Sequence, residues 1–489
     1  MSVAAPTGLR APGRVLLVSC YELGHQPQGI ASPLAFLERA GFRPATLDLA
    51  VEPLDAERVR TARFVAISTP MHTALRIGIE VARRVRAIQP AAHVCFHGHY
   101  ALLHASRFGG VADSILGGES EDALVEIVEA IDRGQRPDAG LSPTAARVLR
   151  KLDFPVPRRD ALPPLSQYAQ LEEPDASGAP VRRLAGHVEA SRGCRHLCGH
   201  CPIPAVYAGR FFIVPVDVVL QDIRNQVRAG ATHITFGDPD FLNGPGHAMR
   251  IVRAMHAEFP VLTFDFTAKI EHLQRERQLL PELVVSGARF VVSAAESLND
   301  RVLAILDKGH TRADLVEVVR RMRDVGLALR PSWLPFTPWS TLEDYVELLD
   351  FVEAEDLIAN VDPVQFSIRL LLPEGSLLLA WPALQAHVGA YDPARLSFSW
   401  AHPDPRMDAL HKSVSRLVAE AARQSDVFEE TFTRVRKLAD SAAGKRRATA
   451  EPTSTPRRDR PPRLTESWFC CAEPLDVGLG SGLDRNARV

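Results

Sequence analysis

The sequence predicts an α/β protein in which a doubly wound parallel sheet is followed by a partial barrel. Three observations carry this prediction. Short apolar runs alternate with helical segments over residues 14–133, the same alternation resumes at about residue 184, and a proline-rich stretch separates the two regions. Apolar runs that alternate with helices are typical of parallel strands with helices on both faces of the sheet.

The first region, residues 14–133, contains four apolar runs of strand length. They are Val15–Val18, Phe64–Ser68, His93–Phe96 and Ser114–Leu116. Ligands of parallel sheets bind beside the carboxyl ends of the strands. The segments expected at those ends are Tyr21–Gln28, Thr69–Thr73, His97–Tyr100 and Gly117–Ser120.

Residues 134–183 form a connector that we expect to be mostly irregular, because proline fixes φ and removes backbone donors. The next region, residues 184–400, contains six strand-like runs with helical segments between them. These runs are His187–Ala190, His233–Phe236, Leu262–Thr267, Phe290–Ala294, Ala328–Pro331 and Val364–Ile368. Six β/α units are fewer than the eight of a closed barrel, so a (β/α)6 barrel open on one side is expected.

The last part of the chain divides into three segments. Residues 401–438 have helical spacing, and residues 439–463 are polar, basic and rich in proline, which is typical of a flexible linker. Residues 464–489 form a tail that carries the sequence TESWFCCAEP.

Bulk composition excludes several classes of protein. The formal net charge is −2, and no run of 18 or more apolar residues occurs. We therefore expect neither nucleic-acid binding nor a membrane span. The first twenty residues do not resemble a signal peptide, and the seven cysteines are odd in number and clustered. Both features favour a reducing, cytoplasmic location over a secreted disulfide framework.

Three cysteines, Cys194, Cys198 and Cys201, stand within the sequence SRGCRHLCGHC. A zinc site normally takes four ligands, for which His196 or His200 could supply the fourth. Cys198 and Cys201 alone form the CxxC pair of a thiol redox site. An iron–sulfur cluster is the third alternative, and three thiolates would leave one iron open to a substrate or cofactor. The position of this segment, directly after the first predicted barrel strand, favours the cluster.

The segment CRHLCGHC resembles the CxxxCxxC motif of radical S-adenosylmethionine (SAM) enzymes. The resemblance implies a TIM-type partial barrel and a 4Fe–4S cluster held by Cys194, Cys198 and Cys201. It implies that SAM chelates the open iron, and that one electron, from a donor such as ferredoxin or flavodoxin, cleaves SAM to methionine and a 5′-deoxyadenosyl radical. The ring of His200 would then lie near the adenine.

Other segments fit the same family. In FGDPDF, residues 236–241, the backbone at Gly237 or the Asp238 side chain is expected at the SAM amino group, with Asp240 as second candidate; the alternative is an Asp-Pro turn. Glu296 begins a stretch similar to one in cobalamin-linked radical SAM proteins, and would face SAM or cap the next helix. Arg369, at the end of the sixth predicted strand, is a candidate for the SAM carboxylate, and Lys269 has similar standing.

Residues 14–133 resemble the Rossmann-type cobalamin-binding domain that precedes many of these barrels, through Asp113 and Gly117–Glu121. The DxHxxG motif, which supplies an axial histidine, is absent. The domain either binds cobalamin or keeps only its fold, and His72, His97 and His99 are candidate pocket residues. With cobalamin, methyl transfer to carbon or phosphorus is expected; without it, a rearrangement, ring formation or sulfur chemistry.

The tail segment FCCAEP resembles the CUAEP/CCAEP-tail group of radical SAM (seleno)proteins, in which Cys471 aligns with selenocysteine. This implies a reactive rather than structural role for Cys471 and its neighbour Cys470. They could act on a substrate in the barrel, exchange electrons with a reductase, or bind a metal. The main hypothesis is a radical SAM enzyme of unknown substrate. The alternative is a zinc- or cluster-stabilised binding or sensor protein without turnover.

Overall fold

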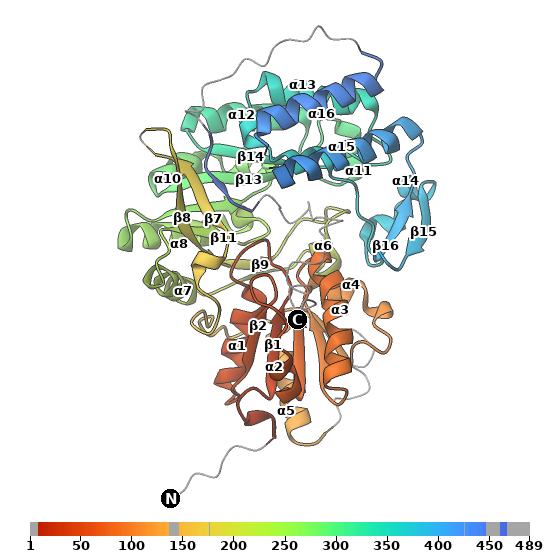
Figure 1. Cartoon of the computed structure of the whole chain (residues 1–489). Coiled ribbons are helices and arrows are strands. Elements are labelled where there is room, and N and C mark those ends of the chain that lie inside the picture. The colour runs from red at the N-terminus through yellow and green to blue at the C-terminus, as the bar shows by residue number, and fades with distance from the viewer. Residues whose placement is uncertain (1–7, 136–145, 176, 425, 446–459, 467–489) are drawn as a thin grey trace, which may run out of the picture.

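Two sheets, one for each predicted α/β region, organise the computed structural model (Figure 1). The structure describes residues 8–135, 146–175, 177–424, 426–445 and 460–466. The first region lies below the barrel in Figure 1, and the C-terminal helices lie above it. Within the described residues, no helix combines the length and the apolar character that a membrane span requires.

The first sheet is parallel throughout and has the strand order β2-β1-β3-β4-β5-β6. Its strands are β1 (Val15–Ser19), β2 (Ala45–Asp48), β3 (Phe64–Ser68), β4 (His93–His97), β5 (Ser114–Gly118) and β6 (Ala146–Val148). Because β1 lies between β2 and β3, the chain reverses its direction of winding at β1. A crevice for a ligand is expected where this reversal occurs, at the carboxyl ends of the strands.

Helices cover both faces of this sheet. On one face, α1 (Gln28–Arg39) and α5 (Glu121–Asp132) pack against Val15 and Leu17. On the other face, α2 (Ala56–Thr61), α3 (His72–Ile88) and α4 (His99–Leu103) pack against Leu16 and Val18. All five residues of β1 are buried, as expected for a strand that has helices on both sides.

The second sheet curls into a half-barrel of five parallel strands within the described residues, which confirms the predicted fold class. These strands are β8 (Pro180–Val188), β11 (His233–Phe236), β12 (Thr263–Thr267), β13 (Ala288–Glu296) and β14 (Ala328–Trp333). The helices that follow them are α7 (Val216–Arg228), α8 (Pro245–Glu258), α9 (Ile270–Arg275), α10 (Leu280–Val285), α11 (Asp300–Ile305), α12 (Arg312–Val325) and α13 (Leu342–Ala354).

The prediction of a sixth barrel strand at residues 364–368 is wrong. Residues Pro363–Ser367 form a 3₁₀ helix, η7, and only a single parallel bridge joins Phe336 to Arg369. Pro363 has no N–H for a strand ladder and favours the first turn of a helix. No strand pairs with this edge of β14 over residues 364–368. A side chain takes its place, because the backbone N–H of Trp333 donates to Gln365 Oε1 at 3.0 Å.

The connector is more regular than its prolines predict. It contributes β6 to the first sheet, and it contributes β7 (Gln170–Pro174), which pairs antiparallel with β8. Pro174, the last residue of β7, and Pro180, the first residue of β8, lie opposite each other beside the hairpin loop. Strand ends tolerate the missing donor, which explains why this stretch forms a hairpin.

The C-terminal part adds a hairpin, two helices and one short strand. The hairpin strands are β15 (Val388–Asp392) and β16 (Ser397–Trp400), and the helices are α15 (Pro405–Gln424) and α16 (Phe428–Ala442). Helix α16 packs on α13, and α15 packs on η7. Strand β17 (Arg463–Leu464) pairs antiparallel with β7, at the edge of the half-barrel sheet.

One buried arginine of the connector, Arg159, ties the two regions together. Its guanidinium makes a two-pronged ion pair with Asp222 on α7, at 3.1 and 2.9 Å. It also donates to the Gln26 carbonyl oxygen of the first region, at 3.2 Å, and to the His187 carbonyl oxygen of β8, at 2.8 Å. The side chains of Arg159 and Asp222 are 5% and 3% exposed. Because both side chains are buried, water cannot readily take the place of either partner in this ion pair.

We predict that Arg159→Ala lowers the free energy of unfolding by about 3–5 kcal/mol, because it leaves the Asp222 carboxylate buried without its partner. Arg158→Ala is the matched control. Arg158 pairs with Glu38 and Asp160, but its side chain is 43% exposed, so the loss should be about 1 kcal/mol or less. Denaturant unfolding measures both, and equal losses for the two variants would contradict the role given to Arg159.

Candidate active site

The three clustered cysteines lie on a loop that leaves the barrel at the carboxyl end of β8. Between β8 and the first cysteine, β9 (Ser191–Gly193) pairs antiparallel with β10 (Phe211–Ile213). Helix α6 (Pro202–Tyr207) begins directly after the third cysteine. Gly193 has φ +75°, and a Cβ there would collide with the Arg210 carbonyl oxygen. The hairpin therefore requires glycine at the residue that precedes Cys194.

All three cysteines of the loop are free, and none forms a disulfide. Cys194 and Cys198 are buried, and Cys201 is half-buried. The Asn243 side-chain amide donates to Cys194 Sγ at 3.5 Å, and Lys269 Nζ donates to Cys198 Sγ at 3.8 Å. Burial raises the pKa of the Cys194 thiol, and the bond from Asn243 opposes that rise.

This donor set fits an iron–sulfur cluster. Such clusters are held by thiolates, and hydrogen bonds to sulfur stabilise their negative charge. Asn243 and Lys269 supply one amide and one ammonium to the sulfurs of a single loop. From the sequence, Lys269 was only a weak candidate for binding the SAM carboxylate. In the structure, its ammonium contacts the Cys198 thiol.

Glu296 is held by a histidine and a lysine at the carboxyl end of β13. Its Oε1 lies 3.1 Å from His200 Nε2 and 3.1 Å from Lys308 Nζ. Burial by itself would raise the pKa of Glu296, but Lys308 and His200 outweigh it and lower the pKa to about 2. The backbone of Glu296 is strained, with φ +63°. Strain of this kind is concentrated at functional sites.

Two residues predicted at SAM, His200 and Glu296, are thus in direct contact. The third member of the cluster, Lys308, was missed as a site residue. It begins the segment KGHT, residues 308–311, at the end of the stretch from Glu296 that resembles cobalamin-linked radical SAM proteins, so its signal was present in the sequence. Only the fold shows that its ammonium reaches the Glu296 carboxylate, 12 residues away along the chain.

The loop after β11 holds the cysteine loop in place. Asp238 is buried and accepts hydrogen bonds from the Ala190 N–H, at 2.9 Å, and from the Ser191 hydroxyl. Burial raises the pKa of Asp238 to about 7. Gly237 leaves room for the His187 ring, which a Cβ would strike. Both residues therefore contact the strand and turn that lead into Cys194.

Asp240 supports the middle of the loop through two histidines. Its Oδ2 lies 2.6 Å from His272 Nδ1, and His272 Nε2 lies 3.2 Å from His196 Nε2. Asp240, His272 and His196 have ligand atoms within 4.8 Å of one another. His196 and His200, the two candidates for a fourth zinc ligand, have partners elsewhere in His272 and Glu296.

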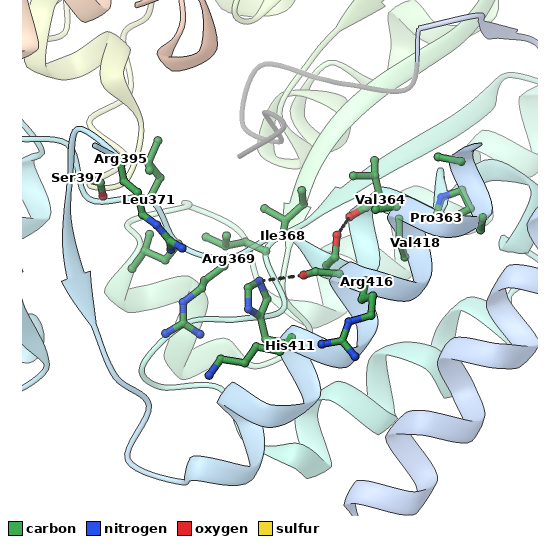
Figure 2. A pocket seen from close by; sticks show the side chains of 18 of the residues that line it. Pro363, Val364, Ile368, Arg369, Leu371, Arg395, Ser397, His411, Arg416 and Val418 are labelled. Carbon is green, nitrogen blue, oxygen red and sulfur yellow. Dashed lines mark hydrogen bonds between the residues drawn. The ribbon is translucent and has the colours of Figure 1, made fainter. Parts of the chain in front are cut away.

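Arg369 lines a cavity of about 1310 Å³ between the barrel, the first region and α15 (Figure 2). Its guanidinium donates to Asp408 Oδ1 at 2.7 Å and to the Trp400 carbonyl oxygen at 2.8 Å, and it lies over the Trp400 ring at 3.5 Å. His200 and Leu334 bound the same cavity from the barrel side. The cavity is therefore continuous with the Glu296 cluster.

The carboxyl edge of the first sheet faces the cysteine loop. Arg192 of β9 lies 2.6 Å from Glu121 Oε1, and Tyr207 of α6 donates to Glu119 Oε1 at 2.8 Å. The GGES stretch, residues 117–120, was expected beside a cofactor, and its glutamate contacts the barrel.

The histidines at this edge are buried, and burial lowers the pKa of His72, His97 and His99 to about 4. Within the described residues, His97 Nε2 and His99 Nδ1 have no hydrogen-bond partner. Neutral ring nitrogens without a partner at the carboxyl edge of a parallel sheet fit a cofactor bound at this edge, and Tyr100 and Arg76, not His97 or His99, line the cavity itself. Cys470 and Cys471, the remaining predicted site residues, lie outside the described residues.

We predict that Lys308→Met lowers the free energy of unfolding by about 3–5 kcal/mol, because it strands the buried Glu296 carboxylate. Lys437→Met is the control. Lys437 is exposed on α16, so its loss should stay within about 0.5 kcal/mol.

The same pair of proteins tests the pKa of Glu296. Its low folded pKa stabilises wild type above the ordinary value of 4.5, and this contribution is lost as the pH falls from there towards 2. The difference in stability between wild type and Lys308→Met should shrink over that range. A constant difference would show that Lys308 does not act through Glu296.

Comparisons with known proteins agree with this geometry. Residues 188–352 match the Radical SAM superfamily. The ribosomal protein uS12 methylthiotransferase RimO of Chlorobium chlorochromatii is 24% identical over 188 residues, which are 35% of this chain and 40% of that protein. The RimO of Desulfotalea psychrophila is 24% identical over 260 residues, 50% of this chain and 52% of that protein. The chain spans about half the length of these relatives, or less.

Two solved structures share the fold over most of the chain. The cobalamin-dependent SAM radical enzyme OxsB with aqua-cobalamin bound has a TM-score of 0.65 at 14% identity, covering 83% of this chain and 67% of that one. The radical SAM methyltransferase TsrM of Kitasatospora setae, with tryptophan substrate and a SAM analog, has a TM-score of 0.58 at 16% identity, covering 83% and 89%. At these identities the likeness shows the fold alone.

Proposed function

We propose that this protein, whose residues 188–352 match the Radical SAM superfamily, is a radical SAM enzyme whose 4Fe–4S cluster is held by Cys194, Cys198 and Cys201. One observation carries the proposal. The three free thiols lie on one loop at the carboxyl end of β8, and two of them receive donors from further strand ends through Asn243 and Lys269. When bound, the cluster and SAM supply one-electron reductive cleavage of SAM to methionine and a 5′-deoxyadenosyl radical.

The residues around the loop would bind SAM and exclude water. His200 offers a planar ring for the adenine, held at a fixed angle by Glu296. Glu296 keeps its charge through Lys308 and has a second oxygen for the polar groups of SAM. The backbone at Gly237, with Asp238 behind it, is our candidate for the SAM amino group. Arg369 is the candidate for the carboxylate, which would compete with Asp408 for the guanidinium.

We propose cobalamin as a second cofactor, bound between the carboxyl edge of the first sheet and the cavity, with methyl transfer as the reaction. Three features support it: the strand order of the first sheet, the orphaned nitrogens of His97 and His99, and the fold shared with OxsB and TsrM. The site lacks the DxHxxG histidine, so it would hold cobalamin without that ligand.

The proposal also covers the C-terminal tail, the electron donor and the cellular location. We propose that Cys471, assisted by Cys470, takes part in turnover after SAM cleavage, as the resemblance to the CUAEP/CCAEP-tail group implies. The electron donor would be a ferredoxin or flavodoxin. The few, clustered cysteines of the sequence are unlike a secreted disulfide framework, so we propose a cytoplasmic enzyme.

Cysteine variants test the cluster and the tail separately. After anaerobic reconstitution, wild type should hold about four iron and four sulfide per chain. Cys198→Ala should lose iron and all 5′-deoxyadenosine formation, because the cluster loses one of its three thiolates. Cys471→Ala should keep the iron and still cleave SAM, but form no product.

Two results would contradict these roles. About one zinc ion per chain with no sulfide would support the binding or sensor alternative instead of the enzyme. Product formation by Cys471→Ala would show that this thiol is not catalytic.

Cobalamin binding is tested by titration with hydroxocobalamin, followed by visible absorption. We expect about one cobalamin per chain. Ser399→Trp, which narrows the cavity from β16, should weaken binding by about tenfold. Ser413→Trp, on α15 but outside the cavity lining, is the matched control. No binding by wild type, or equal binding by the two variants, would exclude cobalamin from this cavity.

A further inference from the structure

The wall of the cavity that α15 contributes is strongly cationic. Among the described residues that line the cavity, eight are lysine or arginine and four are aspartate or glutamate. Three of these acids are already paired: Asp408 with Arg369, Asp392 with Arg395, and Asp426 with Arg434. The field inside the cavity is therefore positive.

Lys412, Arg416 and Arg423 have no acidic partner within the described part of the chain. All three are exposed and line the cavity from α15. Residues 412, 416 and 423 fall on one face of the helix, over about 16 Å of its axis. Like charges one turn apart repel each other, so this face favours an anionic occupant.

The wall beside this cationic face is apolar. Figure 2 shows Val364 and Ile368 near His411 and Arg416 on α15, with Val418 on the same helix, while Leu371 lies beside Arg395. An occupant that matches the cavity needs both acidic and apolar side chains.

The chain itself leads into this cavity. Strand β17 is fastened to β7 by pairing and by the ion pair between Arg463 and Glu172, at 2.8 Å. The Thr465 N–H donates to the Gln170 carbonyl oxygen at 2.9 Å. Thr465 and Glu466 then line the cavity, and Glu466 is the last described residue.

The composition of the next residues suits the cavity. Trp468 and Phe469 are large and apolar, and Glu473 and Asp476 are acidic. No lysine or arginine occurs between Glu466 and Arg485. The segment therefore has the apolar and acidic groups, in that order, that the walls of the cavity require.

We propose that residues 467–484 dock in this cavity in cis, with Glu473 and Asp476 against the cationic face of α15 formed by Lys412, Arg416 and Arg423. Cys470 follows Glu466 by four residues, a reach of at most about 14 Å. Docking would therefore bring Cys470 and Cys471 into the cavity that also contains His200, the residue before Cys201. The inference rests on the cavity and the anchored strand, and not on the proposed reaction.

Disulfide trapping in the full-length protein tests this placement. Ala419→Cys places a thiol on the cationic face of α15, inside the cavity, and Ser413→Cys places one on the same helix outside the cavity lining. Both variants are oxidised mildly with diamide and analysed by peptide mass spectrometry. The thiol introduced at position 419 should be bonded to Cys470 or Cys471 about ten times more often than the thiol introduced at position 413.

Charge reversal provides the second arm. Adding Lys412→Glu and Arg416→Glu to Ala419→Cys should reduce the cross-link to the level of the control. Adding Glu473→Lys and Asp476→Lys as well should restore it, because the ion pairs are then rebuilt with opposite signs.

Three results would overturn the proposal. Equal cross-linking by the Ala419→Cys and Ser413→Cys variants would show that the tail is not in the cavity. A cross-link found only in covalent dimers would assign the face to a second copy. A cross-link insensitive to both charge changes would overturn the ion pairing. None of these readouts needs SAM cleavage, so failure here is distinct from failure of the proposed function.

Discussion

The arrangement of the site depends on one buried arginine, Arg192. It belongs to β9, two residues before Cys194. It contacts Glu121 at the start of α5, Glu119 directly after β5 and Glu189 before β9, at 2.6, 3.6 and 2.8 Å. Burial lowers the pKa of Arg192, but the three carboxylates raise it well above its usual value. A charge held in this way cannot leave its partners without leaving buried carboxylates behind. The cysteine loop is therefore fixed to the carboxyl edge of the first sheet.

The position of the rest of the site follows from where the ion pairs of Arg192 hold the cysteine loop. Because Arg192 of β9 is paired with Glu119 and Glu121 of the first region, the thiols face the barrel. There, Asn243 and Lys269 reach them from the loops after β11 and β12. His200 reaches Glu296 at the end of β13. Four strand ends thus converge on one loop of eight residues, as parallel strands allow because their carboxyl ends meet at the same edge. The two regions and the cavity between them act as one site.

Sequence reasoning predicted the fold well and the site in part. Alternation of apolar runs predicted both sheets, because burial on both faces selects continuous apolar strands. It failed at residues 364–368, where the apolar run lies in a 3₁₀ helix after Pro363 and a Gln365 side chain replaces the ladder. A short apolar run is equally compatible with a buried strand and a buried helical turn. The roles of Asp238 and Asp240 as supports of the loop were also beyond reach, because their partners lie up to 48 residues away.

By itself, the sequence determined which atoms are available: three thiols at fixed spacing after a strand, a glutamate in a recognisable stretch, and an acidic, apolar tail with two further thiols. These are properties of short segments, so spacing along the chain is enough to find them. Only the tertiary structure decided what each atom meets. Lys308 became the partner of Glu296, Lys269 the donor to Cys198, and α15 a cationic wall opposite the end of β17. Charges and donors act over a few ångströms in space, and packing, not sequence distance, brings them that close.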